Sequence, residues 1–153
     1  MKLGPAQIGG FLRDPGACRV VLLYGDDVGM IRERAEALVR SVAGSLDDPF
    51  RVVELDRDSL GGLVDEAASL SLTGGRRVVR ARDVPESVLA HVQAILKGPG
   101  TALVILEAPG IAARTRLRTL LEESPEGTAI GCYPEEGRAL EGSVRDILRA
   151  AGV

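Results

Sequence analysis

The sequence VVLLYGDDVGMIRER, residues 20–34, decides the fold. It begins with five consecutive apolar residues, a pattern typical of a strand that is covered on both faces, as in a parallel sheet. Gly25 interrupts the run, and Asp26 or Asp27 is expected to cap a helix by accepting a hydrogen bond from a free backbone N–H. From Ile31 onward, apolar residues recur every three or four positions, as on one face of a helix. The stretch therefore predicts a strand, a tight acidic loop and a helix.

The same alternation continues along the chain. Short apolar runs between turn residues predict further strands at residues 50–55, 76–82, 101–106 and 128–133. The 3.6-residue periodicity predicts further helices at residues 6–12, 60–72, 85–96, 112–123 and 140–151. Four arginines in the predicted third strand indicate that it is not covered on both faces along its whole length. Five strands alternating with helices predict an α/β domain of three layers, with a parallel five-stranded sheet between helices.

Length and composition fit one globular domain. The 153 residues include 45% hydrophobic and 27% charged residues, which excludes a disordered chain. The net charge of −3 lacks the basic surplus typical of nucleic-acid-binding domains, so we expect little direct DNA binding. No apolar run has transmembrane length, the N-terminus lacks a signal-peptide pattern, and the two cysteines have no metal-ligand spacing. We therefore expect a cytoplasmic protein with reduced thiols, no bound metal and no membrane partner.

The loop after the first strand has the position of a phosphate-binding loop but not its chemistry. Such a loop needs GxxxxGK[ST], in which glycines allow close backbone approach, Lys supplies charge and a hydroxyl binds magnesium. Here Gly25 and Gly29 have the wrong spacing, and neither the Lys nor the Ser/Thr is present. Asp26 and Asp27 place two negative charges where a polyphosphate would lie. We expect no functional Walker A motif and no nucleotide cofactor.

Paired acidic residues after a first strand are also typical of a phosphoacceptor receiver domain. In such a domain, carboxylates hold Mg²⁺ beside an acceptor Asp at the end of the third strand. Asp83 has that place here, so Asp26, Asp27 and Asp83 form one hypothesis for a magnesium-binding enzyme. The Lys that a receiver needs after its fifth strand is missing, because Cys132 stands in that region. The simpler interpretation of the two aspartates is helix capping. The single histidine, His91, has no nucleophile motif beside it, so the sequence does not indicate a catalytic role for it.

Several stretches together resemble the N-terminal domain of the delta subunit of bacterial DNA polymerase III. They are FLRDP at 11–15, residues 21–34, DPFRVV at 48–53, DEAA at 65–68 and GGRRVVR at 74–80. The resemblance runs over nearly the whole chain. It implies an AAA+-like, P-loop-like fold without a working ATP site and without catalytic activity. It also implies that residues 1–153 are one N-terminal domain, a fragment that the lid-like and collar domains of the family would follow.

Members of the delta family bind the ring-shaped sliding clamp, the beta subunit, and help to open it during DNA replication. Their collar domain assembles the loader with the gamma/tau and delta-prime subunits. The family's clamp contact is a short apolar element before the third strand, with a Leu-Phe pair preceded by Ser. Here Ser71 and Leu72 match, whereas Thr73 replaces the aromatic residue that usually dominates such a contact. The resemblance therefore implies a clamp contact at Leu70, Ser71, Leu72 and Thr73, with Arg76 as a charge at its rim.

The residues themselves allow a second interpretation of this segment. Leu70 and Leu72 also continue the apolar stripe of the predicted helix 60–72. Residues two positions apart do not share a helix face, so a regular helix would leave at least one of these leucines to solvent or to a partner. Three hypotheses follow: a clamp-binding domain, a receiver-like phosphoacceptor, and a degenerate NTPase domain with a purely structural role.

Overall fold

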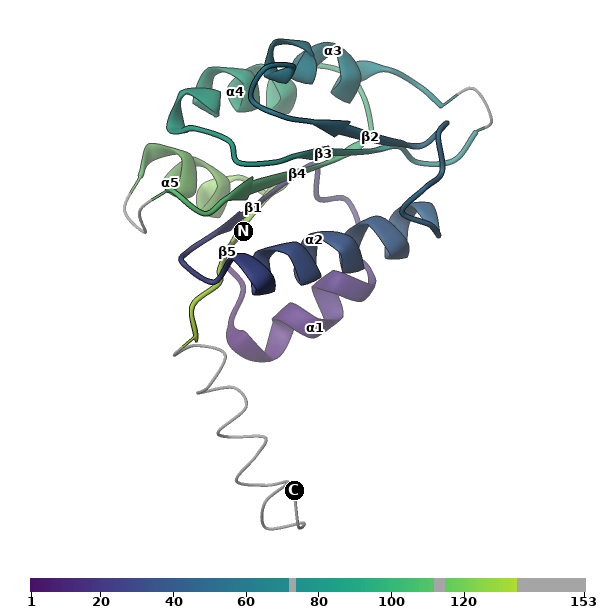
Figure 1. The fold of residues 1–153 in the computed structure, drawn as a ribbon. Helices are drawn as coiled ribbons and strands as arrows, with labels where there is room; N and C mark the ends of the chain where they lie inside the picture. The colour runs from purple at the N-terminus through teal and green to yellow at the C-terminus, as the bar shows by residue number, and fades with distance from the viewer. Residues whose placement is uncertain (72–73, 112–114, 135–153) are drawn as a thin grey trace, which may run out of the picture.

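The computed structural model of the protein describes residues 1–71, 74–111 and 115–134. A parallel sheet of five strands forms its centre (Figure 1). The strands are β1 (Val20–Tyr24), β2 (Val52–Leu55), β3 (Val78–Ala81), β4 (Leu103–Ala108) and β5 (Gly127–Gly131). They are adjacent in the order β2-β3-β4-β1-β5, and every neighbouring pair is parallel. The predicted five-stranded parallel sheet is confirmed.

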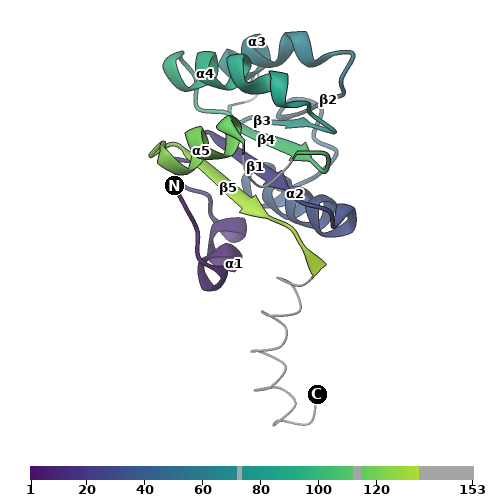
Figure 2. The same ribbon diagram turned by 90° about the vertical axis from the view of Figure 1, so that its left-hand side faces the viewer.

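Helices cover both faces of this sheet, so the domain has three layers (Figures 1 and 2). The helices α1 (Pro5–Arg13) and α2 (Val28–Ala43) pack on one face. The other face is covered by α3 (Leu63–Ala68), α4 (Leu89–Lys97) and α5 (Arg116–Glu123), with 3-10 turns at Leu60–Gly62 and Glu86–Val88. None of the described helices is long and apolar enough to cross a membrane. The three-layer α/β architecture is also confirmed.

Strand β1 is the centre of the core, as its apolar run predicts. All five of its residues are buried, because β4 and β5 flank it and helices cover both faces. Side chains alternate between the faces: Leu22 joins the cluster under α3, α4 and α5, and Leu23 joins the cluster under α1 and α2. A continuous hydrophobic run is what a strand buried on both faces requires.

The loop after β1 turns directly into α2. The Oδ1 atom of Asp27 accepts a hydrogen bond from the Met30 N–H at 3.0 Å, so Asp27 rather than Asp26 is the helix cap. Gly25 has a φ of 123°, which L-residues rarely adopt, and a Cβ at this position would lie within 3 Å of the backbone of Cys132. The strand, loop and helix predicted from residues 20–34 are therefore present.

The predicted helix at residues 60–72 is wrong at both ends. Its first turn is 3-10 rather than α-helical, and two adjacent glycines, which are poor helix formers, lie in it. Helix α3 ends at Ala68, because Ser69 is extended and its hydroxyl donates a hydrogen bond back to the Asp65 carbonyl at 2.8 Å. Leu70 therefore lies beyond the helix, and the argument from helix faces does not apply to it.

The third strand is shorter than the predicted residues 76–82. The expectation that this range is not buried along its whole length holds at its ends, where Arg76 is partly exposed and Arg82 is exposed. All four residues of β3 are buried, and the side chain of Arg80 is only 2% exposed. Arg80 tolerates burial because carboxylates surround it.

Helix α5 begins at Arg116, with the Thr115 side chain as its cap, and residues 112–114 lie outside the described ranges. The predicted helix at 140–151 also lies outside them.

Candidate functional site

The carboxyl ends of β1 and β4 are the place where an open parallel α/β sheet usually binds a ligand. These strands are neighbours, and the helices that follow them, α2 and α5, lie on opposite faces, which opens a crevice between them. A small hollow of about 160 Å³ lies there. Its lining residues are Val28, Ile31, Arg32, Arg82, Asp83, Glu107 and Pro109.

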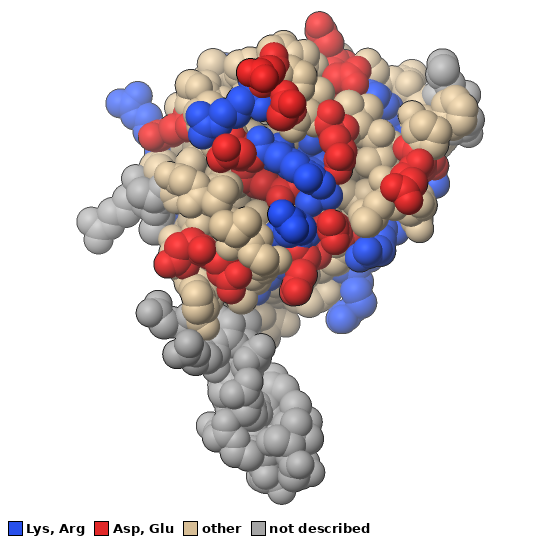
Figure 3. All heavy atoms as spheres, viewed as in Figure 1, with Lys and Arg blue, Asp and Glu red and all other residues tan. Residues whose placement is uncertain are grey.

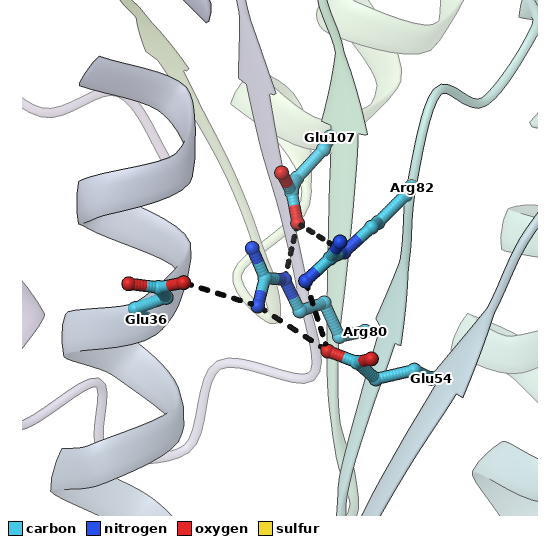
Figure 4. A network of polar contacts seen from close by, with 5 residues as sticks. All are labelled: Glu36, Glu54, Arg80, Arg82 and Glu107. Atoms are coloured by element: carbon cyan, nitrogen blue, oxygen red, sulfur yellow. Dashed lines mark hydrogen bonds and ion pairs between the residues drawn. The ribbon is translucent and has the colours of Figure 1, made fainter. Parts of the chain in front are cut away.

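A network of five charged residues lies beside this crevice, and two of them, Arg82 and Glu107, line its hollow (Figure 4). The Nε of buried Arg80 donates to a carboxylate oxygen of Glu107, and its Nη1 lies 3.3 Å from Glu54 and 3.7 Å from Glu36. Arg82 pairs with two of these three carboxylates, at 3.1 Å from Glu54 and 4.0 Å from Glu107. The five residues come from β2, β3, β4, α2 and the loop after β3, so the network ties the sheet to its helical layer.

This charge arrangement does not suit a polyphosphate. Arg80 and Arg82 are already paired with carboxylates, and Glu107 adds a negative charge to the crevice itself. Asp26 is exposed in the neighbouring loop, and Asp27 caps α2. A bound phosphate would meet these carboxylates at short range, and like charges repel.

The strand order separates the residues of the receiver hypothesis. Strand β4 lies between β1 and β3, so Asp26 and Asp27 are two strands, roughly 10 Å, away from Asp83. A receiver fold has the order 2-1-3-4-5, in which its first and third strands are neighbours. The Asp83 carboxylate instead pairs with Arg57 at 3.4 Å. In the described ranges no three His, Cys, Asp or Glu side chains are grouped to hold a metal, so the magnesium site at Asp26, Asp27 and Asp83 is wrong.

The segment after α3 brings an apolar side chain to the surface. Leu70 is 80% exposed, more than any other exposed large hydrophobic residue in the described ranges. Ser71 is half-buried, and Leu72 and Thr73 lie outside the described residues. The segment precedes β3, so it lies at the amino edge of the sheet, opposite the crevice.

Arg76, at the end of this segment, connects three loops. Its guanidinium donates hydrogen bonds to the carbonyls of Gly16 and Thr101, each at 2.7 Å, and to the carbonyl of Cys18. Burial lowers the pKa of Arg76 below its ordinary value. Next to it, buried Arg77 donates to the backbone and the carboxylate of Glu66, which ties β3 to the end of α3.

The buried Cys18 thiol makes a testable contribution to the pH dependence of stability. Burial raises its pKa, although its Sγ contacts the Thr128 hydroxyl at 3.6 Å and the Val20 carbonyl at 3.3 Å. Above about pH 8.5 the unfolded thiol loses its proton while the folded thiol keeps it, so folding stability is lost as pH rises through the folded pKa. We expect the free energy of unfolding, from urea titrations, to fall by about 1 kcal/mol per pH unit more in the native protein than in Cys18→Ala. Parallel pH profiles of the two proteins would contradict this assignment.

Comparison with known proteins shows a likeness of fold. No model of a known family matches the sequence, and no curated protein is similar to it in sequence. Among solved structures, a Bacillus subtilis DNA clamp loader delta protein superposes with a TM-score of 0.67 at 16% identity, over 85% of this chain and 42% of that one. A DNA polymerase III gamma subunit-related protein from Thermotoga maritima gives 0.60 at 16% identity, over 94% of this chain and 53% of that one. The chain spans about half the length of these two proteins and shares their fold over most of its own length.

Proposed function

We propose that this chain is the clamp-binding domain of a clamp-loader delta subunit. It would contact the sliding clamp through Leu70, Ser71, Leu72 and Thr73, with Arg76 at the rim of the contact. The observation that carries the proposal is the exposure of Leu70 beyond the end of α3, in the segment to which the sequence resemblance assigns the clamp contact. The fold shared with a DNA clamp loader delta protein supports it.

Burial of Leu70 in an apolar pocket of the clamp would supply the affinity. Complete burial of a leucine side chain contributes about 1.5 to 3 kcal/mol. Thr73 in place of an aromatic residue removes a typical hot-spot anchor, so the leucines carry most of the contact. A domain that binds the open ring more tightly than the closed ring would favour opening. The gamma/tau and delta-prime subunits would be partners of a longer, cytoplasmic protein rather than of this domain alone.

The face seen in Figure 3 does not have the charge distribution of a nucleic-acid surface. Acidic and basic groups alternate over the middle of this face. Nucleic-acid surfaces instead gather basic side chains into a continuous patch.

The proposal predicts saturable binding of this chain to the beta sliding clamp of the same organism. The double variant Leu70→Ala, Leu72→Ala should weaken that binding at least tenfold, because it removes most of the apolar contact. The measurement is a titration of the clamp with the chain, monitored by the fluorescence anisotropy of labelled clamp or by calorimetry.

The matched control is Val28→Ala. Val28 is also an exposed aliphatic residue, at 53%, but it follows β1 and so lies at the opposite edge of the sheet. This variant should bind the clamp as the native chain does. If the double variant binds the clamp as tightly as the native chain, Leu70 and Leu72 do not form the contact. If the native chain does not bind the clamp, the hypothesis of a degenerate NTPase domain with a structural role is favoured.

A further inference from the structure

A second hollow lies at the amino edge of the sheet, away from the crevice described above. Its volume is about 320 Å³. Its lining residues are Gly16, Ala17, Arg19, Arg76, Gly100, Thr101 and Glu126. They come from the loop before β1, the segment before β3, the loop before β4 and the turn before β5. Two arginines therefore meet at one small cavity with short side chains around it.

Arg19 is the buried member of this pair. Its side chain is held among backbone carbonyls, with Nη1 donating to Gly98 at 2.9 Å and Nη2 donating to Pro99 at 3.0 Å. The residue is 7% exposed, and its Nε is buried without a hydrogen-bond acceptor among residues 1–71, 74–111 and 115–134. A buried charge without an opposite charge is costly, so this guanidinium has unused capacity for an anion.

Neither arginine at the hollow has a carboxylate partner in the part of the chain that the structure describes. Among the described residues, no Asp or Glu oxygen lies within 4.0 Å of the guanidinium nitrogens of Arg19 or Arg76. The other two buried arginines differ, because Arg77 pairs with Glu66 and Arg80 pairs with three glutamates. A guanidinium has five N–H donors, of which Arg76 uses three and Arg19 two, all on neutral carbonyls.

Two acidic residues belong to the surroundings of the pair. Asp14 interacts with Arg76 through space, and one of its carboxylate oxygens accepts a hydrogen bond from the Gly16 N–H at 3.0 Å. Glu126 lines the hollow, and its backbone carbonyl accepts hydrogen bonds from the N–H groups of Arg19 and Val20. Its side chain therefore reduces the positive potential without being needed for these backbone bonds.

We propose that this hollow binds a phosphate group, as inorganic phosphate or as a small phosphate monoester, between the guanidiniums of Arg19 and Arg76. Guanidinium groups match the oxygens of phosphate in geometry and charge. The several unused N–H donors suit a dianion with three terminal oxygens better than a carboxylate with two. The volume lies in the lower range of small-ligand sites, so it leaves room for the body of an ester. The proposal does not rest on the clamp contact.

Calorimetric or NMR titration of the chain with inorganic phosphate and with glycerol 3-phosphate tests this site. We expect saturable binding near neutral pH that weakens as sodium chloride is added. Glu126→Gln should tighten binding about fivefold, because it removes one negative charge from the cavity wall. Arg76→Met should weaken binding at least tenfold. Arg40→Met is the matched control, since Arg40 is exposed in the last turn of α2 and does not line the hollow.

The outcomes separate the sources of the phosphate and decide the proposal. Tighter binding of glycerol 3-phosphate identifies an ester as the ligand, and equal binding identifies free phosphate; either result supports the site. Absence of saturable binding up to about 20 mM, or acetate binding as tightly as phosphate, overturns it. Arg76 also holds three loops, so Arg76→Met is informative only where circular dichroism shows that it folds. Glu126→Gln then decides, and unchanged affinity in that variant overturns the proposal.

Discussion

Gly25→Ala is expected to lower the free energy of unfolding by roughly 3 to 5 kcal/mol, because two costs combine at this position. A Cβ at residue 25 would lie 2.3 Å from the Cys132 carbonyl oxygen and 2.8 Å from its carbon, and both are backbone atoms of the residue that follows β5. The φ of 123° is in addition a conformation that alanine rarely adopts. A side-chain movement cannot relieve either cost, because the clash is with backbone atoms. The backbone of Cys132 is also held in place, since its N–H donates a hydrogen bond to the Tyr24 carbonyl at 2.6 Å.

Urea denaturation followed by circular dichroism measures this effect. The control is Gly10→Ala in helix α1, where no heavy atom lies within 4 Å of the new Cβ and φ is not positive. That variant should be neutral or stabilising by up to about 1 kcal/mol, because alanine favours a helix more than glycine does. A Gly25→Ala protein with the stability of the native chain would show that the loop between β1 and α2 moves away from β5.

Arg80→Met is expected to destabilise the fold by about 3 to 5 kcal/mol, the cost of leaving a buried ion pair half empty. The Glu107 side chain is 9% exposed, and its main partner is the Arg80 guanidinium. Among the described ion pairs, removal of that guanidinium leaves this buried carboxylate with the longer contact to Arg82 at 4.0 Å. Glu54 and Glu36 are more exposed, so water compensates them more readily.

A double-mutant cycle separates this charge effect from lost packing. Arg80→Met, Glu107→Leu removes both charges, and we expect it to be more stable than Arg80→Met alone by at least about 1.5 kcal/mol. Arg82→Met is the matched control: its side chain is 46% exposed, so we expect a change below about 1 kcal/mol. If the destabilisations of the single variants Arg80→Met and Glu107→Leu in chemical denaturation add up to that of the double variant, the two residues are not energetically coupled, which would contradict the network as a coupled unit.

The candidate clamp contact was only partly predictable from the sequence. The resemblance placed it before β3, but the predicted helix 60–72 gave Leu70 the wrong surroundings. The side chain of Ser69 competes for the backbone of α3 and ends the helix early, an effect that apolar periodicity does not register. The exposure of Leu70 follows from that early end.

The sequence missed the ion-pair network for a related reason. Arginine in a strand suggests a solvent-facing side, yet Arg80 lies between strands that carry Glu54 and Glu107 on the same face. A signal was present, because Glu107 directly follows the apolar run of the predicted strand 101–106, where an unpaired carboxylate would be costly. The Arg19 and Arg76 pair gave no signal, since the two residues are far apart in the chain.

The sequence by itself determined the elements of this protein: the buried run of β1, an aspartate cap for α2 and the alternation of strands and helices. These depend on periodicity and on neighbours a few residues away, so a single stretch such as residues 20–34 contains the information. Only the tertiary structure decided the strand order, because a helical crossover can return a strand to more than one place in a sheet. That order put β4 between β1 and β3, which separated Asp27 from Asp83 and enclosed Arg80 among carboxylates. The acidic loop therefore caps a helix, and the candidate sites lie where distant segments meet at the amino edge of the sheet.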